Sequence, residues 1–135
     1  MNLTIDTYAW VEVSRDSPRG RIARSAMDAA EACITPAVVL AELACTFVRD
    51  GFSDDLIVRV LETIREASDV APIDPSIALG AARALTELRD SARARKLSLP
   101  GLGDALILAT ARHARSSLLT GDPHFRELPE TVWIG

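Results

Sequence analysis

The chain has 135 residues, of which 48% are apolar and 25% charged, so it is long enough for one hydrophobic core and is not a disordered protein. Its longest apolar runs are too short to cross a bilayer and no signal peptide is visible, so we expect a single domain over residues 1–135, in the cytoplasm and without a membrane contact. The net charge of −4 argues against a protein that holds nucleic acid by bulk attraction alone.

The first half of the chain combines two short strands with four helices. In chain order the predicted elements are a strand over residues 2–6, helices over 8–15 and 18–32, a strand over 33–35, and helices over 36–50 and 54–67. Pro18 suits the first turn of a helix, Gly51 suits a helix end, and Ser53 suits an N-cap.

The second half of the chain continues this alternation. In chain order it predicts a strand over residues 70–73, a long helix over 75–95, a loop over 100–103, a helix over 104–115, a strand over 118–120, a turn over 121–123 and a closing strand over 131–134. Strands separated by helices predict an α/β fold with a mostly parallel central sheet and helices on both faces.

The two cysteines, Cys33 and Cys45, lie in apolar stretches. We expect both to be reduced, buried and structural. Two cysteines without a CxxC spacing do not predict a zinc site.

The basic residues are nearly all arginines, and eight basic residues form two clusters. These are Arg15, Arg19, Arg21 and Arg24, and Arg89, Arg93, Arg95 and Lys96. Arginine matches phosphate oxygens well, so phosphate binding is one interpretation. Solvated helix faces are the other, and the sequence leaves both open.

Four acidic residues stand in positions that a solvated helix face does not explain. Asp6 ends the first predicted strand, and Asp122 follows the fourth. Glu42 lies inside an apolar helix, and Asp104 begins one. Helix or turn capping is an alternative for the three aspartates, and an ion pair with a buried arginine is the alternative for Glu42.

These four acids are able to converge at one edge of the sheet. In an open parallel sheet, sites form at the carboxyl ends of the strands, where Asp6 and Asp122 are placed. Converging carboxylates repel one another, so they need a cation to remain ionised together. Because all the ligands are oxygens, the ion expected is Mg²⁺ or Mn²⁺, which is the usual apparatus for phosphodiester hydrolysis.

Four segments in this order resemble PIN domains. They are Ile5-Asp6-Thr7, the Val-Leu-Ala-Glu-Leu sequence around Glu42, Asp104-Ala-Leu-Ile-Leu-Ala-Thr-Ala, and Leu119-Thr120-Gly121-Asp122-Pro123-His124-Phe125. Within this family, the size and plain layout resemble VapC-type toxins. Where many relatives have an acid two residues after the last aspartate, this chain has His124, which we take as a substrate contact or bystander rather than a ligand.

The resemblance implies a ribonuclease in which Asp6, Glu42, Asp104 and Asp122 surround Mg²⁺ or Mn²⁺, and Thr120 helps to orient a metal-bound water. Asp6 and Asp104 are the expected direct ligands. Glu42 and Asp122 ligate, hold metal-bound waters or act as a base. The resemblance also implies an RNA substrate, a homodimer and a cognate antitoxin that holds the toxin inactive.

Apolar residues near the N-terminal helices are candidates for these protein contacts, with core packing as the alternative. They are Tyr8, Trp10, Val11, Val13, Phe47, Val48 and Phe52.

Three rival functions are open to a chain of this pattern. A receiver-type phosphotransfer domain needs a lysine near a late strand end, and Lys96 is poorly placed for this. A phosphatase with an Asp-x-Asp pair does not fit, because Asp6 is followed by Thr7 and Tyr8. The remaining rival is a catalytically degenerate PIN domain that only binds RNA or a protein partner, against which the presence of all four acids argues.

Overall fold

The fold was analysed in a computed structural model that describes residues 1–135. Its centre is a five-stranded sheet in the order β3-β2-β1-β4-β5, and all four neighbouring pairs are parallel. The strands are β1 (Asn2–Ile5), β2 (Ala32–Pro36), β3 (Asp69–Ala71), β4 (Ser117–Thr120) and β5 (Thr131–Trp133). This confirms the predicted α/β fold with a parallel sheet.

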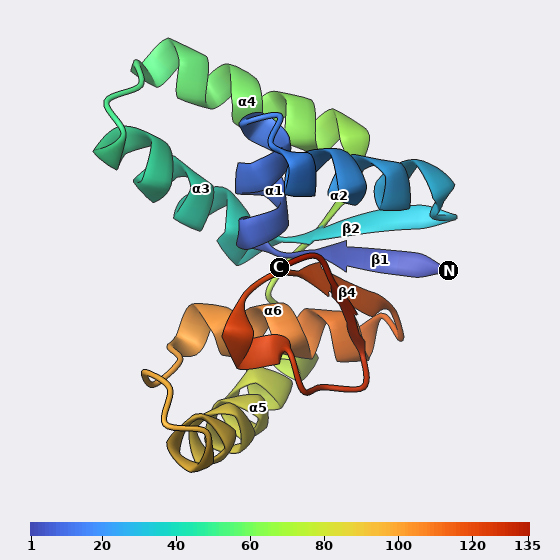
Figure 1. Cartoon of the computed structure of the whole chain (residues 1–135), viewed down its shortest axis with the longest axis vertical. Helices are drawn as coiled ribbons and strands as arrows, with labels where there is room; N and C mark the ends of the chain where they lie inside the picture. The colour runs from blue at the N-terminus through green and yellow to red at the C-terminus, as the bar shows by residue number, and fades with distance from the viewer.

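Six α-helices and one short 3₁₀ helix connect the strands. They are α1 (Thr7–Ser14), α2 (Pro18–Ala29), α3 (Ala37–Arg49), α4 (Asp54–Ala67), α5 (Pro75–Ala94), α6 (Leu102–His113) and η1 (Pro123–Phe125). Helices α1 to α4 lie on one side of the sheet, and α5 and α6 lie on the other (Figure 1). None of the helices combines the length and the hydropathy that a membrane-spanning segment needs.

The core is densest where β1 and β4 pack against α6. Leu3, Ile5, Leu118 and Leu119 are almost completely buried, and so is every residue of the segment 105–111 in α6. A helix that is apolar on all sides is stable only when it is covered on all sides. Here α6 packs against both the sheet and α5, which leaves its first turn and its last two residues at the edge of the core.

The strand register brings the ends of β1 and β4 to the same level. Ile5 pairs with Leu119, and the backbone N–H of Asp6 donates to the carbonyl of Leu119 at 3.1 Å. The residues that follow the two strands therefore emerge side by side at the carboxyl edge of the sheet. This edge is where we expected Asp6 and Asp122 to meet.

Several boundaries differ from those predicted. Helix α2 ends at Ala29 and not near Ala32, because Ala32 already pairs with Asn2 in the sheet. Pro36 is the last residue of β2, so α3 begins one residue later than expected. Helix α6 begins at Leu102, two residues before the predicted start.

The expectation that both cysteines are buried was wrong. Both are free thiols, but Cys45 is exposed and Cys33 is only partly buried. Helix α3 buries Val39, Leu43 and Phe47, which recur every four residues. Cys45 is two residues beyond Leu43 and therefore about 200° around the helix from the buried face.

Candidate active site: an acidic cluster at the carboxyl edge of the sheet

Asp6 is the most buried acid of the chain, with 3% of its surface exposed. It caps α1, where Oδ1 accepts from the backbone N–H of Thr7 at 2.7 Å, and Oδ2 accepts from the hydroxyl of Thr120 at 2.6 Å. Burial, together with the nearby charges of Asp122 and Asp104, raises its pKa to about 7, against the lowering effect of its hydrogen bonds to Thr120 and Thr7. Asp6 thus has neutral hydrogen-bond donors but no cationic partner.

Thr120 joins Asp6 to Asp122. Its hydroxyl donates to Asp6 and accepts from the backbone N–H of Asp122 at 2.9 Å. Asp122 in turn caps η1, because its Oδ1 accepts from the backbone N–H of His124 at 2.9 Å. The last residue of β4 therefore fixes the relative positions of two carboxylates that are far apart in sequence.

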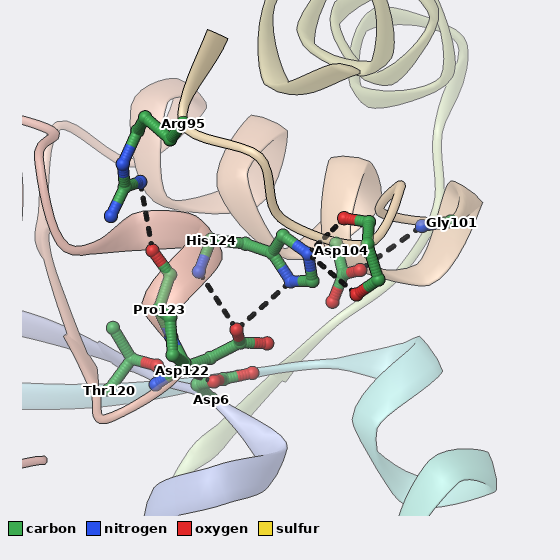
Figure 2. Close-up of polar contacts among 9 residues, drawn as sticks. Asp6, Arg95, Gly101, Asp104, Thr120, Asp122, Pro123 and His124 are labelled. Atoms are coloured by element: carbon green, nitrogen blue, oxygen red, sulfur yellow. Dashed lines mark hydrogen bonds and ion pairs between the residues drawn. The ribbon is translucent and has the colours of Figure 1, made fainter. Parts of the chain in front are cut away.

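Asp104 occupies the third position of α6, where its Oδ2 accepts from the backbone N–H of Gly101 at 3.1 Å. This back-bond is one half of a capping box, and glycine at the N-cap supplies no side chain for the other half. Burial, followed by the charge of Asp122, raises the pKa of Asp104 despite the Gly101 bond. Figure 2 shows the carboxyl groups of Asp104 and Asp122 beside the ring of His124, and that of Asp6 next to Asp122.

Glu42 belongs to the same group of acids but comes from α3, which lies on the opposite side of the sheet from α6 (Figure 1). The hydroxyl of Thr7 donates to its Oε1 at 2.7 Å, and no arginine pairs with it. Its pKa is raised, first by burial and then by the charges of Asp104 and Asp122. The ion pair with a buried arginine that we considered as an alternative is therefore absent.

Glu42 lies directly against the first turn of α6. A Cβ atom added to Gly103 would lie 2.7 Å from its Oε2, closer than such contacts allow. Gly103 was missed in the sequence analysis. The available signal was a glycine inside a helix, next to a candidate site residue, where close approach of another group is a common reason for glycine.

His124 connects the cluster to the loop before α6. Its Nε2 lies 2.7 Å from the carbonyl oxygen of Ser98, so Nε2–H donates there. Its Nδ1 lies 3.0 Å from Oδ1 of Asp122, outside hydrogen-bonding alignment. The contact with Ser98 was also missed, because no local pattern relates residues 98 and 124.

Taken together, the structure brings all four predicted acids and Thr120 to one edge. Capping accounts for one oxygen each of Asp6, Asp104 and Asp122, but not for the position of Glu42. The donor atoms are all carboxylate oxygens, which suit a hard divalent cation. As the side chains stand, no three acidic, histidine or cysteine residues are close enough to share one ion, because hydrogen bonds turn several of these oxygens toward neutral partners.

Comparison with known proteins identifies the fold. The PIN domain family matches residues 3–131. Similar solved structures include a toxin–antitoxin complex from Klebsiella pneumoniae, with a TM-score of 0.67 and 20% identity over 98% of both chains. VapBC2 from Rickettsia felis bound to a promoter DNA fragment gives a TM-score of 0.68 and 17% identity over 98% of this chain and 97% of that chain.

A third similar structure is Mycobacterium tuberculosis VapC20, described as a Sarcin-Ricin loop cleaving toxin, with a TM-score of 0.65 and 16% identity over 86% of both chains. Comparison with curated proteins gave no match. At these identities the likeness to solved structures is one of fold. The match to the family itself extends over nearly the whole sequence, and the chain therefore belongs to the PIN domain family.

Proposed function

We propose that the protein is a metal-dependent endoribonuclease that hydrolyses RNA phosphodiester bonds, and that it is the toxin of a toxin–antitoxin pair acting in the cytoplasm. The observation that carries the proposal is the set of four carboxylates at the carboxyl edge of a PIN fold. Burial and mutual repulsion raise the pKa of Asp6, Glu42 and Asp104, and no arginine or lysine pairs with any of them. A structurally similar PIN protein is described as cleaving the Sarcin-Ricin loop, which supports RNA as the substrate class.

The proposed cofactor is Mg²⁺, or Mn²⁺ in its place. Asp6 and Asp104 would hold the ion, with Asp122 and Glu42 as further ligands or as acceptors for its waters. When bound, such an ion supplies a Lewis acid and lowers the pKa of a coordinated water. The four carboxylates fit this ion by donor type and by their unbalanced charge.

The chain's own residues have distinct proposed roles around the reacting phosphate. Thr120 holds Asp6 through the 2.6 Å hydrogen bond and sits where it can orient a water beside Asp6 and Asp122. Thr7 fixes Glu42 through the 2.7 Å bond to Oε1, which leaves Oε2 free to accept a proton or to bind a water. These contacts hold two carboxylates through neutral hydroxyl groups and leave their charge for the cation.

Metal binding is tested without reference to activity. Titration calorimetry with Mn²⁺ should give binding to the wild-type chain and none, or at least tenfold weaker binding, to the Asp6→Asn/Asp104→Asn double variant. Asp55→Asn, an exposed acid in the first turn of α4, is the matched control and should bind like the wild type. Added Mn²⁺ should also raise the melting temperature, as it must for any ligand of the folded state. Equal Mn²⁺ affinity in the double variant would remove the proposed site.

An RNA-cleavage assay distinguishes a nuclease from a degenerate PIN domain that only binds RNA or a protein. We expect the wild-type chain to cut single-stranded RNA in Mg²⁺ or Mn²⁺ and to stop in EDTA. Binding of RNA without cleavage in either metal, while Mn²⁺ is bound, would instead support the degenerate binding module.

A cognate antitoxin is the proposed protein partner, since several similar structures are toxin–antitoxin complexes. Of the apolar residues considered as contacts, Trp10 and Phe47 are buried in the core, whereas Val48 and Phe52 are exposed. A pocket of about 420 Å³ between α1, α2 and α4, with Trp10 and Val13 among its lining residues, offers an apolar seat for a partner segment.

The partner and the oligomeric state have separate tests. We expect a protein encoded beside this gene to co-purify with the chain, and its absence from the purified material would contradict the antitoxin proposal. We also propose a homodimer, which light scattering should detect at micromolar concentration. A monomeric mass there would contradict the dimer alone.

A further inference from the structure

The turn that carries Asp122 is bracketed by two arginines. Arg95 donates from Nη1 to the carbonyl oxygen of Pro123 at 2.9 Å, directly after Asp122 (Figure 2). Arg19 donates from Nη1 to the hydroxyl of Tyr8 at 3.1 Å. The ring of Tyr8 covers Gly121, directly before Asp122, so closely that a Cβ atom on Gly121 would overlap it.

The two arginines come from opposite sides of the sheet. Arg19 is in the first turn of α2, whereas Arg95 directly follows α5, and these helices lie on opposite sides of the sheet (Figure 1). Through Tyr8 and Pro123 both guanidinium groups are nevertheless attached to the same three-residue turn. The turn that carries Asp122 therefore has an arginine on each side.

Neither of these two arginines makes a close ion pair within the chain. Arg19 has no acidic partner, and Arg95 forms one ion pair, with Glu127 at 3.9 Å, whose side chain is largely exposed. Other arginines of the same two clusters are paired: Arg15 with Asp50, Arg21 with Asp16 and Arg93 with Asp90. The partners that fix Arg19 and Arg95 are a hydroxyl and a carbonyl, so their remaining N–H groups are available to an anion.

The acidic edge of the sheet repels the phosphates of a nucleic-acid strand. The chain has a net charge of −4, and the site concentrates four carboxylates. A bound divalent ion would compensate the negative charge of the phosphate at the cluster, but not the charges of the phosphates on either side of it. Guanidinium groups are suited to those, because their planar fork matches two phosphate oxygens.

We propose that Arg19 and Arg95 bind the backbone phosphates of a single RNA strand on the two sides of the phosphate that reaches the acidic cluster. This inference rests on the proposed function, and it goes further by assigning the residues that position the strand. It also assigns roles to five members of the arginine clusters: Arg19 and Arg95 contact the strand, whereas Arg15, Arg21 and Arg93 pair with acids on solvated helix faces.

The test is the salt dependence of RNA binding by Arg19→Gln and Arg95→Gln. Arg83→Gln on α5 and Arg59→Gln on α4 are matched controls, because each removes one exposed arginine that has no acidic partner. A fluorescein-labelled single-stranded RNA is titrated in EDTA, where no cleavage occurs, and its anisotropy is measured from about 50 to 200 mM salt. For a single strand, each lost phosphate contact should lower the slope of log Kd against log salt by about 0.7.

We expect this loss of slope, with weaker binding at low salt, in Arg19→Gln and Arg95→Gln but not in the two controls. Arg95→Lys should retain the slope because it retains the charge, whereas a purely structural role of the Arg95–Pro123 bond would change the melting temperature and leave the slope unaltered. The same loss is expected with a DNA strand of the same sequence, since the phosphates are common to both.

The proposal is overturned if Arg19→Gln and Arg95→Gln keep the wild-type slope, if the loss is confined to RNA, or if the wild-type chain binds neither strand. Its failure is distinguishable from failure of the proposed function. A wild-type chain that cleaves RNA in Mn²⁺ while both variants cleave and bind like the controls contradicts only the phosphate contacts. A chain that binds RNA with the expected slopes but never cleaves it contradicts only the nuclease.

Discussion

The two ends of α6 carry charged clusters of opposite design. In its first turn, Asp104 belongs to a group of carboxylates that hydrogen-bond to hydroxyl and backbone N–H groups and pair with no arginine or lysine. In its last turn, Arg112 forms a two-pronged ion pair with Glu87, at 2.7 and 2.8 Å, and a further bond of 2.7 Å with Glu130. The hydrogen bond from Arg112 lowers the pKa of Glu87, whereas burial and neighbouring charges raise the pKa of Asp104.

The comparison of the two ends of α6 shows that acids with a structural role are paired with a cation of the chain itself. Around Arg112 the chain supplies the compensating cation from its own sequence, so the cluster is complete within the folded chain. At the carboxyl edge it supplies threonine hydroxyls and backbone N–H groups instead, which hold the carboxylates in place and leave their charge uncompensated. This is the arrangement that the proposed divalent cation from solution would complete.

The largest effect is expected for Asp104→Asn. The substitution keeps the shape and the capping ability of the side chain but removes one ligand charge. RNA cleavage should fall by about 10² or more, comparable to the loss of one key electrostatic group. Because repulsion within the cluster is relieved, the metal-free variant should melt no lower than the wild type.

Cleavage rates in Mg²⁺ and Mn²⁺ and melting curves in EDTA check this prediction on one protein. Near wild-type cleavage with unchanged melting would mean that Asp104 is only a helix cap. A melting temperature that falls sharply would instead mean that Asp104 belongs to a structural pair, as Glu87 does.

Gly103→Ala should reduce activity by roughly tenfold, since small displacements of site groups have effects of this order or larger. The new methyl group occupies the space of the Glu42 carboxylate and pushes it away from the cluster. Stability should not fall, because alanine is a better helix former than glycine. The shorter side chain in Gly103→Ala/Glu42→Asp should recover part of the lost rate, and a double variant no better than Gly103→Ala would show that Gly103 does not act through Glu42.

Arg112→Met tests the other end of the helix. Two carboxylates lose their cation, one of them the half-buried Glu130, so the free energy of unfolding should fall by about 1–2 kcal/mol after allowance for solvent screening. Urea unfolding measures this loss. The cleavage rate per folded molecule should stay at the wild-type value, and a rate that falls with stability intact would mean that the two ends of α6 are coupled.

The smallest effect is a pH dependence of stability that comes from Glu87. Its pKa is lowered in the folded chain from the ordinary value of 4.5, so its stabilising contribution is present above pH 4.5 and is lost as the pH falls below it. Glu87→Gln should remove this part of the acid sensitivity. Unfolding of wild type and variant at neutral and acid pH should give curves that converge at low pH, whereas a constant difference would exclude the ion pair as its source.

The acid edge was predictable from the sequence because parallel strands all present their carboxyl ends at one edge. Asp6 and Asp122 follow buried strands, and Glu42 and Asp104 interrupt apolar helices, so local pattern and topology together place them. The contacts that hold them were not predictable in the same way. Gly103 against Glu42 and Ser98 against His124 depend on the packing of α3 and η1 against α6 and its preceding loop, which no local pattern records.

The exposure of Cys45 shows a second limit of prediction from the sequence, which concerns burial. Its apolar neighbours suggested burial, but α3 has a clear buried face, and counting from Leu43 places Cys45 almost opposite to it. Composition over a short stretch says less than position around the helix. The same count, applied to Val48, would have separated it from Phe47, which is buried.

The bond between Thr120 and Asp6 joins residues that are 114 positions apart, and it has a consequence for how the protein is made. During synthesis on the ribosome, a growing chain acquires Asp6 and Glu42 early but has neither Asp104 nor the turn after β4 until much later. The central strand β1 likewise waits for β4 as its second neighbour. The site proposed to cut RNA is therefore complete only after the late strands have emerged and docked.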